Sequence, residues 1–169
     1  MLLSGLGLAP LPTTPAYALP PGCTGAETPG NDVIECLVLL PGQSINSGAG
    51  QDLIFVTGDA AGTINGGDGH DSISIFGGSA TGTINGGDGH DTVDIDGACL
   101  GATLNGGNGE DYLTTNSVTV NCQLNGENNN DTLEIATAGT GDMNGGPGTD
   151  TCIQRGFVAP ATKTNCELP

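Results

Sequence analysis

The sequence predicts an all-β fold, a parallel β-roll or β-solenoid of about seven coils with two short strands per coil. Three observations carry this prediction. A glycine-rich motif that closes with Asp recurs at intervals of 19 or 20 residues. Apolar and polar residues alternate between the motifs, which is the period of a strand. The chain has 31 glycines and only 3% aromatic residues, too few large side chains for a thick globular core.

The repeat is clearest in its central copies. Residues 65–73 read N-G-G-D-G-H-D-S-I, residues 85–93 read N-G-G-D-G-H-D-T-V, and residues 105–113 read N-G-G-N-G-E-D-Y-L. The closing Asp occurs seven times, as Asp32, Asp52, Asp71, Asp91, Asp111, Asp131 and Asp150. Several outer copies have lost glycines, as expected of a repeat array whose terminal coils must cap the stack.

Three apolar rows lie at fixed offsets from the Asp and are expected to fill the coil interior. The row two residues after the Asp contains Ile34, Ile54, Ile73, Val93, Leu113 and Leu133. The row four residues after it contains Val56, Ile75, Ile95 and Ile135. The row seven residues before it contains Ile45, Ile64, Ile84, Leu104, Leu124 and Met143. Stacked coils would form two parallel sheets around this narrow filling, and no segment has a helical period.

A row of asparagines precedes the Asp by six residues in six repeats, at Asn46, Asn65, Asn85, Asn105, Asn125 and Asn144. We interpret this row as an Asn ladder whose side-chain amides satisfy turn backbone groups along the stack.

The chain divides into three segments. The apolar run of residues 2–9 and the Ala16-Tyr17-Ala18 sequence indicate a secretion signal in residues 1–18, the alternative being an apolar tail. The β-roll is expected over residues 19–158 and a C-terminal capping tail over residues 159–169. Secretion predicts an extracellular location.

Six cysteines fit an oxidising compartment, where disulfides persist. Their phase in the repeat predicts Cys23–Cys36 and Cys152–Cys166 as links at the two open ends, and Cys99–Cys122 as a link between neighbouring coils. Free buried cysteines are the weaker alternative because the count is even. Zinc is not expected, since no C-x-x-C occurs.

Charge excludes two classes of partner. The net charge is −17, and Arg155 and Lys163 are the only Lys or Arg residues, so a nucleic-acid surface is excluded. An anionic membrane would repel the chain, and no membrane insertion is expected.

The repeated G-G-x-G-x-D-x-U-x pattern, in which U is a large apolar residue, resembles the RTX family of hemolysin-type calcium-binding repeats, whose β-roll binds Ca²⁺ in its turns. The resemblance covers residues 27–153. One departure is that the motif occurs once per 19–20 residues instead of on both edges of the roll. The calcium row is therefore expected on one edge only.

The resemblance implies that the closing Asp binds Ca²⁺ together with carbonyls of the glycine-rich turn. It carries over to the set Gly67, Asp68, Gly69, Asp71, Gly87, Asp88, Gly89, Asp91, Gly107, Asn108, Gly109 and Asp111, and further to Asp52, Asp131 and Asp150. At the Asp131 turn, Glu127 and Asn129 replace glycines, and Asp150 lies at an end without a neighbouring turn on one side. We expect about three to five bound ions.

Electrostatics favour calcium independently of the resemblance. Stacked coils would place the carboxylates about 4.8 Å apart, where two charges repel by about 3.5 kcal/mol at an effective dielectric constant near 20. A Ca²⁺ ion between two turns could reach oxygens of both. The alternative is a calcium-free glycine solenoid with solvated Asp turns.

These features predict a secreted calcium-binding protein with a structural or adhesive role, in which Ca²⁺ folds and stabilises the roll. Its partner could be a cell surface or another copy of the chain. The alternative function is ice binding through Thr63, Thr83 and Thr103, which form a Thr-x-Asn column. An enzyme is not expected: His70 and His90 are accompanied by no nucleophile, acid–base pair or cofactor loop.

Overall fold

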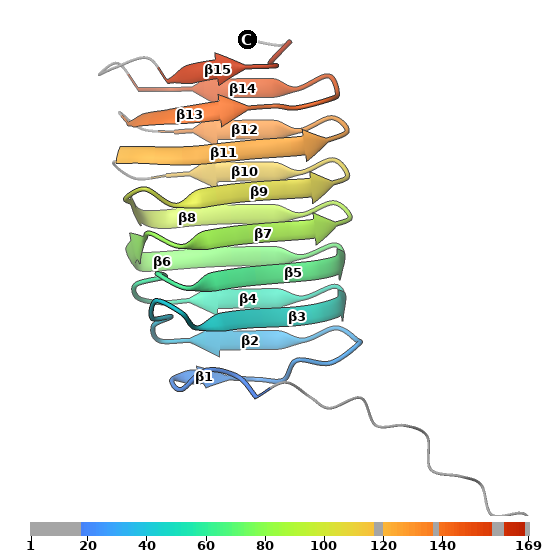
Figure 1. Ribbon diagram of the computed structural model, residues 1–169, viewed down its shortest axis with the longest axis vertical. Helices are drawn as coiled ribbons and strands as arrows, with labels where there is room; N and C mark the ends of the chain where they lie inside the picture. The colour runs from blue at the N-terminus through green and yellow to red at the C-terminus, as the bar shows by residue number, and fades with distance from the viewer. Residues whose placement is uncertain (1–17, 117–119, 137–138, 157–160, 168–169) are drawn as a thin grey trace, which may run out of the picture.

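The chain winds into a parallel β-solenoid of about six turns with two strands per turn (Figure 1). This computed structural model describes residues 18–116, 120–136, 139–156 and 161–167, and these ranges contain no helix. The all-β solenoid is as predicted, and the number of turns is close to the expected seven. The predicted secretion signal lies almost wholly outside the described residues.

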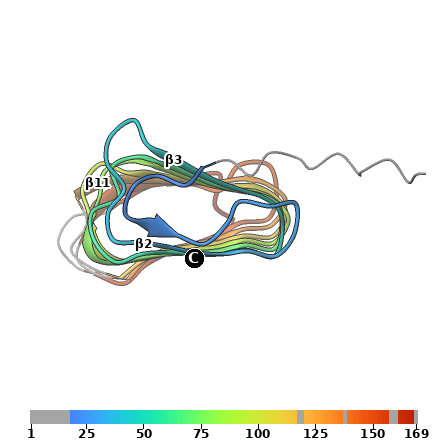
Figure 2. The same ribbon diagram turned by 90° about the horizontal axis from the view of Figure 1, so that it is seen from below.

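Two sheets form the long sides of the coil, which is a flattened oval when viewed along the stack (Figure 2). The eight-stranded sheet contains β1 (Cys23–Thr24), β2 (Val33–Cys36), β4 (Leu53–Val56), β6 (Ser72–Ala80), β8 (Thr92–Cys99), β10 (Tyr112–Thr115), β12 (Thr132–Ile135) and β14 (Thr151–Gln154). The seven-stranded sheet contains β3 (Ser44–Gly50), β5 (Thr63–Gly69), β7 (Thr83–Asp88), β9 (Thr103–Asn108), β11 (Val120–Asn128), β13 (Thr140–Asn144) and β15 (Thr162–Thr164).

Equivalent positions of successive repeats pair with one another in both sheets. Ile64 pairs with Ile84, and Ile84 pairs with Leu104. All strand pairs are parallel except β1 with β2, where Cys23 pairs with Cys36. The repeat period of the sequence is therefore the circumference of one coil, and a side chain meets its own equivalent in the coils on either side.

The predicted apolar rows form the core. All their members are at most 1% exposed. The alternation of burial along β4, β6 and β8 explains this arrangement, since successive residues of a strand point to opposite faces. The interior is thus a narrow filling of aliphatic side chains from both sheets, and every coil depends on its neighbours for burial.

The Asn ladder is present, but its hydrogen bonds differ from those expected. The Asn65 amide donates to Asn46 Oδ1 at 2.5 Å, the Asn85 amide to Asn65 Oδ1 at 2.6 Å, and the series continues through Asn105 and Asn125 at 2.7 and 2.8 Å. The side chains bond to one another and not to turn backbone. The reason is that parallel stacking repeats the amide at the strand spacing, which suits a ladder of identical groups.

The three disulfides join the predicted pairs, Cys23–Cys36, Cys99–Cys122 and Cys152–Cys166. The first links β1 to β2 at the N-terminal end, and the last links β14 to the residues after β15. Cross-links at the two ends hold the coils that have a neighbour on one side only.

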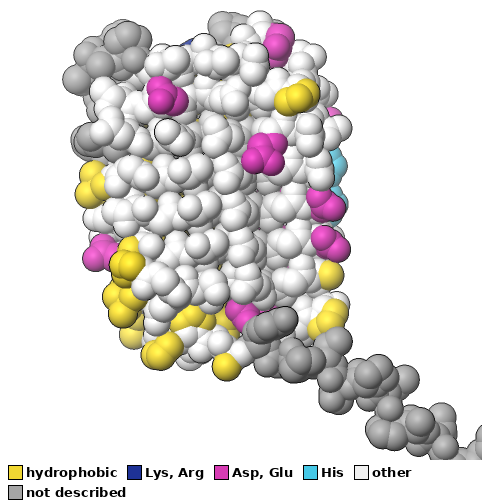
Figure 3. Space-filling model, in the orientation of Figure 1, with side chains coloured by type: hydrophobic (Ala, Val, Ile, Leu, Met, Phe, Trp, Pro, Cys, Tyr) yellow, Lys and Arg dark blue, Asp and Glu magenta, His cyan; other side chains and the backbone are white. Residues whose placement is uncertain are grey.

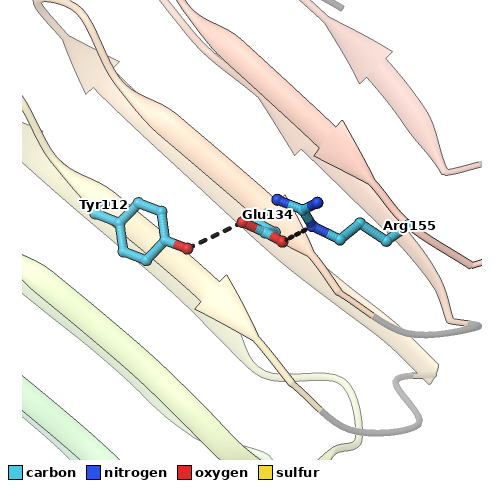
Figure 4. A network of polar contacts seen from close by, with 3 residues as sticks. All are labelled: Tyr112, Glu134 and Arg155. Atoms are coloured by element: carbon cyan, nitrogen blue, oxygen red, sulfur yellow. Dashed lines mark hydrogen bonds and ion pairs between the residues drawn. The ribbon is translucent and has the colours of Figure 1, made fainter.

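A polar network crosses three coils on the outer face of the eight-stranded sheet (Figure 4). The Tyr112 hydroxyl donates to Glu134 Oε2 at 3.0 Å, and Arg155 Nε forms an ion pair with Glu134 Oε1. The Arg155 guanidinium lowers the pKa of Glu134. This network joins the last coils of the stack.

The turn before Asp131 keeps the shape of the other turns although it has lost glycines. Glu127 and Asn129 have φ values of 76° and 84°, in the left-handed region. Gly107 and Gly109 have φ values of 119° and 133° at the equivalent positions. Stacking on neighbouring turns therefore imposes a backbone conformation that Glu127 disfavours.

Glu127→Gly should raise the free energy of unfolding by about 0.5–1 kcal/mol. The change removes the cost of a left-handed non-glycine residue, about 1–2 kcal/mol. It also raises the conformational entropy of the unfolded chain, which offsets about 0.4–1 kcal/mol of that gain. Urea denaturation in excess EDTA measures the change. Glu127→Gln is the control, since it removes the charge and keeps the side chain. An equal gain in both variants would attribute the effect to charge and contradict the backbone argument.

Candidate metal centre

The Asp-containing turns lie along one edge of the solenoid, where each strand of the seven-stranded sheet leads into the next strand of the eight-stranded sheet (Figure 1). Glycines set the shape of these turns. Gly67 and Gly69 have φ values of 113° and 136°, and the equivalent glycines of the next two coils are similar. A side chain at Gly87 would collide with the carbonyl oxygen of Gly67 in the preceding coil. The glycines thus permit the turns to stack.

The seven closing aspartates form a buried line that we call the Asp column. Asp32 is 8% exposed, and the other six are at most 3% exposed. The backbone N–H of each of the first six aspartates donates to Oδ1 of the Asp in the following coil, at distances of 2.7–2.9 Å. These bonds fix each carboxylate and use one of its two oxygens.

The second oxygen of the carboxylate lacks such a partner in most of the column. Among the described residues nothing hydrogen-bonds the buried Oδ2 atoms of Asp52, Asp71, Asp91, Asp111, Asp131 and Asp150. A buried carboxylate oxygen without a partner costs several kcal/mol, of the order of the penalty for burying a polar group. Protonation of these six carboxylates, or a cation beside Oδ2, would remove this cost.

The first glycine of each Gly-Gly pair lies where an Oδ2 atom and a backbone carbonyl oxygen of the next coil approach each other. A Cβ placed on Gly66 would lie within 2.6 Å of both Asp71 Oδ2 and the carbonyl oxygen of Gly86. The first glycines of the next three coils have the same two neighbours within 2.7 Å. We call these glycines, together with the one in the last repeat, the inner glycines: Gly66, Gly86, Gly106, Gly126 and Gly145. A side chain at these positions would press against both oxygens, so glycine lets the carboxylate and the carbonyl oxygen come close to each other.

The first two coils fill the equivalent position with side chains. Ser47 is fully buried there, and its hydroxyl donates to the Gly66 carbonyl at 2.7 Å. Glu27 precedes Thr28, which pairs with Gly48, so Glu27 occupies the same register one coil earlier. Its carboxylate accepts from the Asn46 N–H at 2.8 Å.

Asp32, at the N-terminal end of the column, is satisfied within the protein. The Thr28 N–H donates to its Oδ2 at 2.6 Å, and the Thr28 hydroxyl donates to its Oδ1 at 2.9 Å. The N-terminal end of the column therefore closes with hydrogen bonds, and the inner glycines begin at Gly66.

The other predicted side-chain ligands do not join the column. Asp68, Asp88 and Asn108 lie three residues before the Asp and are exposed on the outer side of the turn. The Asn108 amide donates to Asp88 Oδ1 at 2.6 Å. Figure 3 shows acidic and histidine side chains along this edge. The outer carboxylates add negative potential near the column without converging with it.

His70 and His90 stack on the same edge, with ring centroids 4.9 Å apart and an interplanar angle of 9°. The His90 N–H donates to His70 Nδ1 at 3.0 Å, and the Glu110 N–H donates to His90 Nδ1 at 3.2 Å. Each ring uses Nδ1 to accept from the next coil. Because the rings are nearly parallel, their remaining nitrogens do not converge on one metal position.

The electrostatics of the column favour proton or cation uptake. Burial raises the pKa of Asp91 to about 6, of Asp111 to about 7 and of Asp131 to about 6, and it raises the pKa of Asp71. Neighbouring carboxylates raise these values further, whereas the N–H donor of the preceding Asp lowers them.

Nowhere in the described ranges do three His, Cys, Asp or Glu side chains form a group that could hold a metal ion. A cation in the column would therefore take backbone carbonyls as ligands, with one or two carboxylates. Sequence reasoning identified the closing Asp and missed the inner glycines. The sequence does mark these glycines, because the first glycine of the pair is kept in a repeat that has lost the second: Gly126 remains where Glu127 replaces the second glycine.

No protein-family model, curated protein or solved structure matches this chain. The resemblance to calcium-binding repeats consequently rests on the motif residues. The described residues include no helix long and apolar enough to cross a bilayer.

The metal-free protein should lose stability as pH rises from about 4 to about 7. The folded carboxylates have pKa values above the ordinary 3.8, so in this range they keep protons that the unfolded chain has released. Their contribution is complete below about pH 4 and is lost as pH passes through 6–7. Thermal unfolding in EDTA at about pH 5 and about pH 7.5 measures it.

Asp111→Asn should reduce this pH dependence, because the amide does not titrate. Asp68→Asn, an exposed change on the same edge, serves as the control for general charge repulsion. A metal-free midpoint that rises between the two pH values would contradict the expected sign.

Proposed function

We propose that this protein is a secreted calcium-binding solenoid in which Ca²⁺ between stacked turns stabilises the fold, and that the folded stack serves a structural or adhesive role. The observation that carries the proposal is the series of buried, unpartnered Oδ2 atoms in the Asp column. Five of them, all except Asp52 Oδ2, lie close to a backbone carbonyl oxygen at an inner glycine. A cation bound between the turns would neutralise the carboxylate charge and would also coordinate Oδ2 and the carbonyl oxygen.

The donor set favours calcium among the common metals. The inner surface of the turn offers carboxylate and carbonyl oxygens, with no thiolate or imidazole directed into it. Ca²⁺ binds six to eight such oxygens in flexible geometry, whereas Mg²⁺ requires a stricter octahedron and keeps its waters. The exposed Asp68 and Asp88 raise the local cation concentration. Gly66, Gly86, Gly106 and Gly126 mark up to four equivalent positions, within the expected three to five ions.

Secretion and calcium binding fit together. Three disulfides are typical of an oxidising compartment, and extracellular calcium is abundant enough to fill sites of modest affinity. A ligand that binds the folded stack and not the unfolded chain stabilises the fold by mass action. The role is that of a rigid extracellular element, with adhesion to a cell surface or self-association as its use.

The chain contains a natural comparison for this proposal. Ser47 occupies the position of an inner glycine and bonds the carbonyl that would face the ion. Gly86→Ser should therefore remove one Ca²⁺ per chain, and Ser47→Gly should add one beside Asp52. Equilibrium dialysis with elemental analysis measures the number of bound ions.

The two exchanges control each other, since they make opposite changes at equivalent positions. Gly101→Ser is a further control, because nothing lies within 4 Å of a Cβ there, although its φ of 85° adds local strain. Unchanged stoichiometry in both Gly86→Ser and Ser47→Gly would place any bound calcium outside the column. Absence of calcium binding by the wild type would refute the proposal.

Ice binding is the second candidate, and the strand register favours it. Thr63, Thr83 and Thr103 pair in register and form one outward column beside the Asn ladder. Gln123 and Asp142 occupy the next two positions of this column, so the row of threonines ends at Thr103. Thermal hysteresis of the purified protein distinguishes this function from a purely structural one.

A further inference from the structure

We propose that the C-terminal tail, residues 161–167, completes an additional Ca²⁺ site at Asp150, with Asn165 and Glu167 as oxygen ligands and the Cys152–Cys166 disulfide as their anchor. The inference rests on the proposed calcium function. The proposed ligands Asn165 and Glu167 lie outside the glycine–Asp repeats. The tail stacks on the Asp150 turn, which no further repeat follows.

The tail reproduces the backbone of a further turn. β15 pairs with β13 so that Asn144 lies opposite Thr164, which places Asn165 beside Gly145. The Asn165 amide donates to Asn144 Oδ1 at 2.9 Å and extends the Asn ladder by one member. Asn165 has a φ of 52°, in the left-handed region that the motif glycines also use.

Glu167 takes the place of the next Asp in the column. The Asp150 N–H donates to Glu167 Oε2 at 2.6 Å, as each earlier Asp N–H donates to the carboxylate that follows it. The Glu167 N–H donates in turn to the Asp150 carbonyl at 3.0 Å. Glu167 follows Asn165 by two residues, whereas Asp150 follows Gly145 by five. The extra methylene of Glu lets the carboxylate reach the column from this shorter turn.

The oxygen atoms of this turn meet as in the earlier coils. Asp150 is 0% exposed, and no described residue hydrogen-bonds its Oδ2. A Cβ on Gly145 would collide with both Asp150 Oδ2 and the carbonyl oxygen of Asn165. An unpartnered buried carboxylate oxygen therefore lies close to a tail carbonyl oxygen at an inner glycine, and the exposed Glu167 accepts from the N–H of the same Asp150.

The disulfide fixes this short tail in register. Cys166 lies between the two proposed ligands, and its partner Cys152 is 0% exposed in the core two residues after Asp150. The link thus joins the strand that follows the Asp to the segment that supplies the ligands. We assign it a positioning role at this site.

The test compares calcium stoichiometry in the full chain. Glu167→Gln should bind one Ca²⁺ fewer than the wild type, with loss of the calcium-induced shifts of the Gly145 and Asn165 amide signals in NMR spectra. Asp142→Asn is the matched control, since it removes an exposed carboxylate from the outer face of β13. It should bind as many ions as the wild type. The double variant Cys152→Ser/Cys166→Ser should lose the same ion, whereas Cys23→Ser/Cys36→Ser should keep it.

The outcomes separate this inference from the proposal on which it rests. A wild type that binds calcium while Glu167→Gln binds the same number of ions overturns the tail site and leaves the interior sites standing. Retention of every ion in Cys152→Ser/Cys166→Ser overturns the anchoring role. A wild type that binds no calcium overturns both proposals.

Discussion

The fold depends on how a line of buried carboxylates is neutralised. Parallel stacking places each closing Asp one strand spacing from the next, about 4.8 Å. Six of the carboxylates keep an oxygen without a partner among the described residues. Hydrogen bonds from successive backbone N–H groups orient the column but satisfy only Oδ1. The same coil stacking that buries the aliphatic rows therefore also brings buried carboxylates together, and we propose that calcium compensates their charge with oxygen ligands from the turns.

The other features of the stack either permit this arrangement or close its ends. Left-handed glycines let the turns approach, and inner glycines let Oδ2 approach a carbonyl oxygen of the next coil. At the N-terminal end the side chains of Glu27, Ser47 and Asp32 form hydrogen bonds within the protein. At the C-terminal end Glu167 continues the ladder of acceptors. The ends are chemically different, so a column of ions would have a defined start and finish.

The fold could be predicted from the sequence because a period of two within each strand fixes which residues point inward. Asp71, Ile73 and Ile75 share one parity and are buried, whereas Ser72 and Ser74 between them are partly exposed. Repeat phase likewise predicted the cysteine pairs. The roles of Ser47 and Glu167 were not predictable in this way. Ser47 is a single exception within a row of glycines, and the tail turn has a different length, so no periodic signal marks either residue.

Thermal unfolding followed by circular dichroism at about pH 7.5, with the disulfides oxidised, tests the central claim most directly. The protein is compared in EGTA, in Ca²⁺ and in Mg²⁺ at equal concentration. Each filled site adds about 2.7 kcal/mol when free calcium is a hundredfold above its dissociation constant. We therefore expect a large, EGTA-reversible rise in the midpoint with Ca²⁺ and little change with Mg²⁺. The same midpoint in EGTA and in Ca²⁺ would contradict the account, because the buried carboxylates would then be stable without a cation.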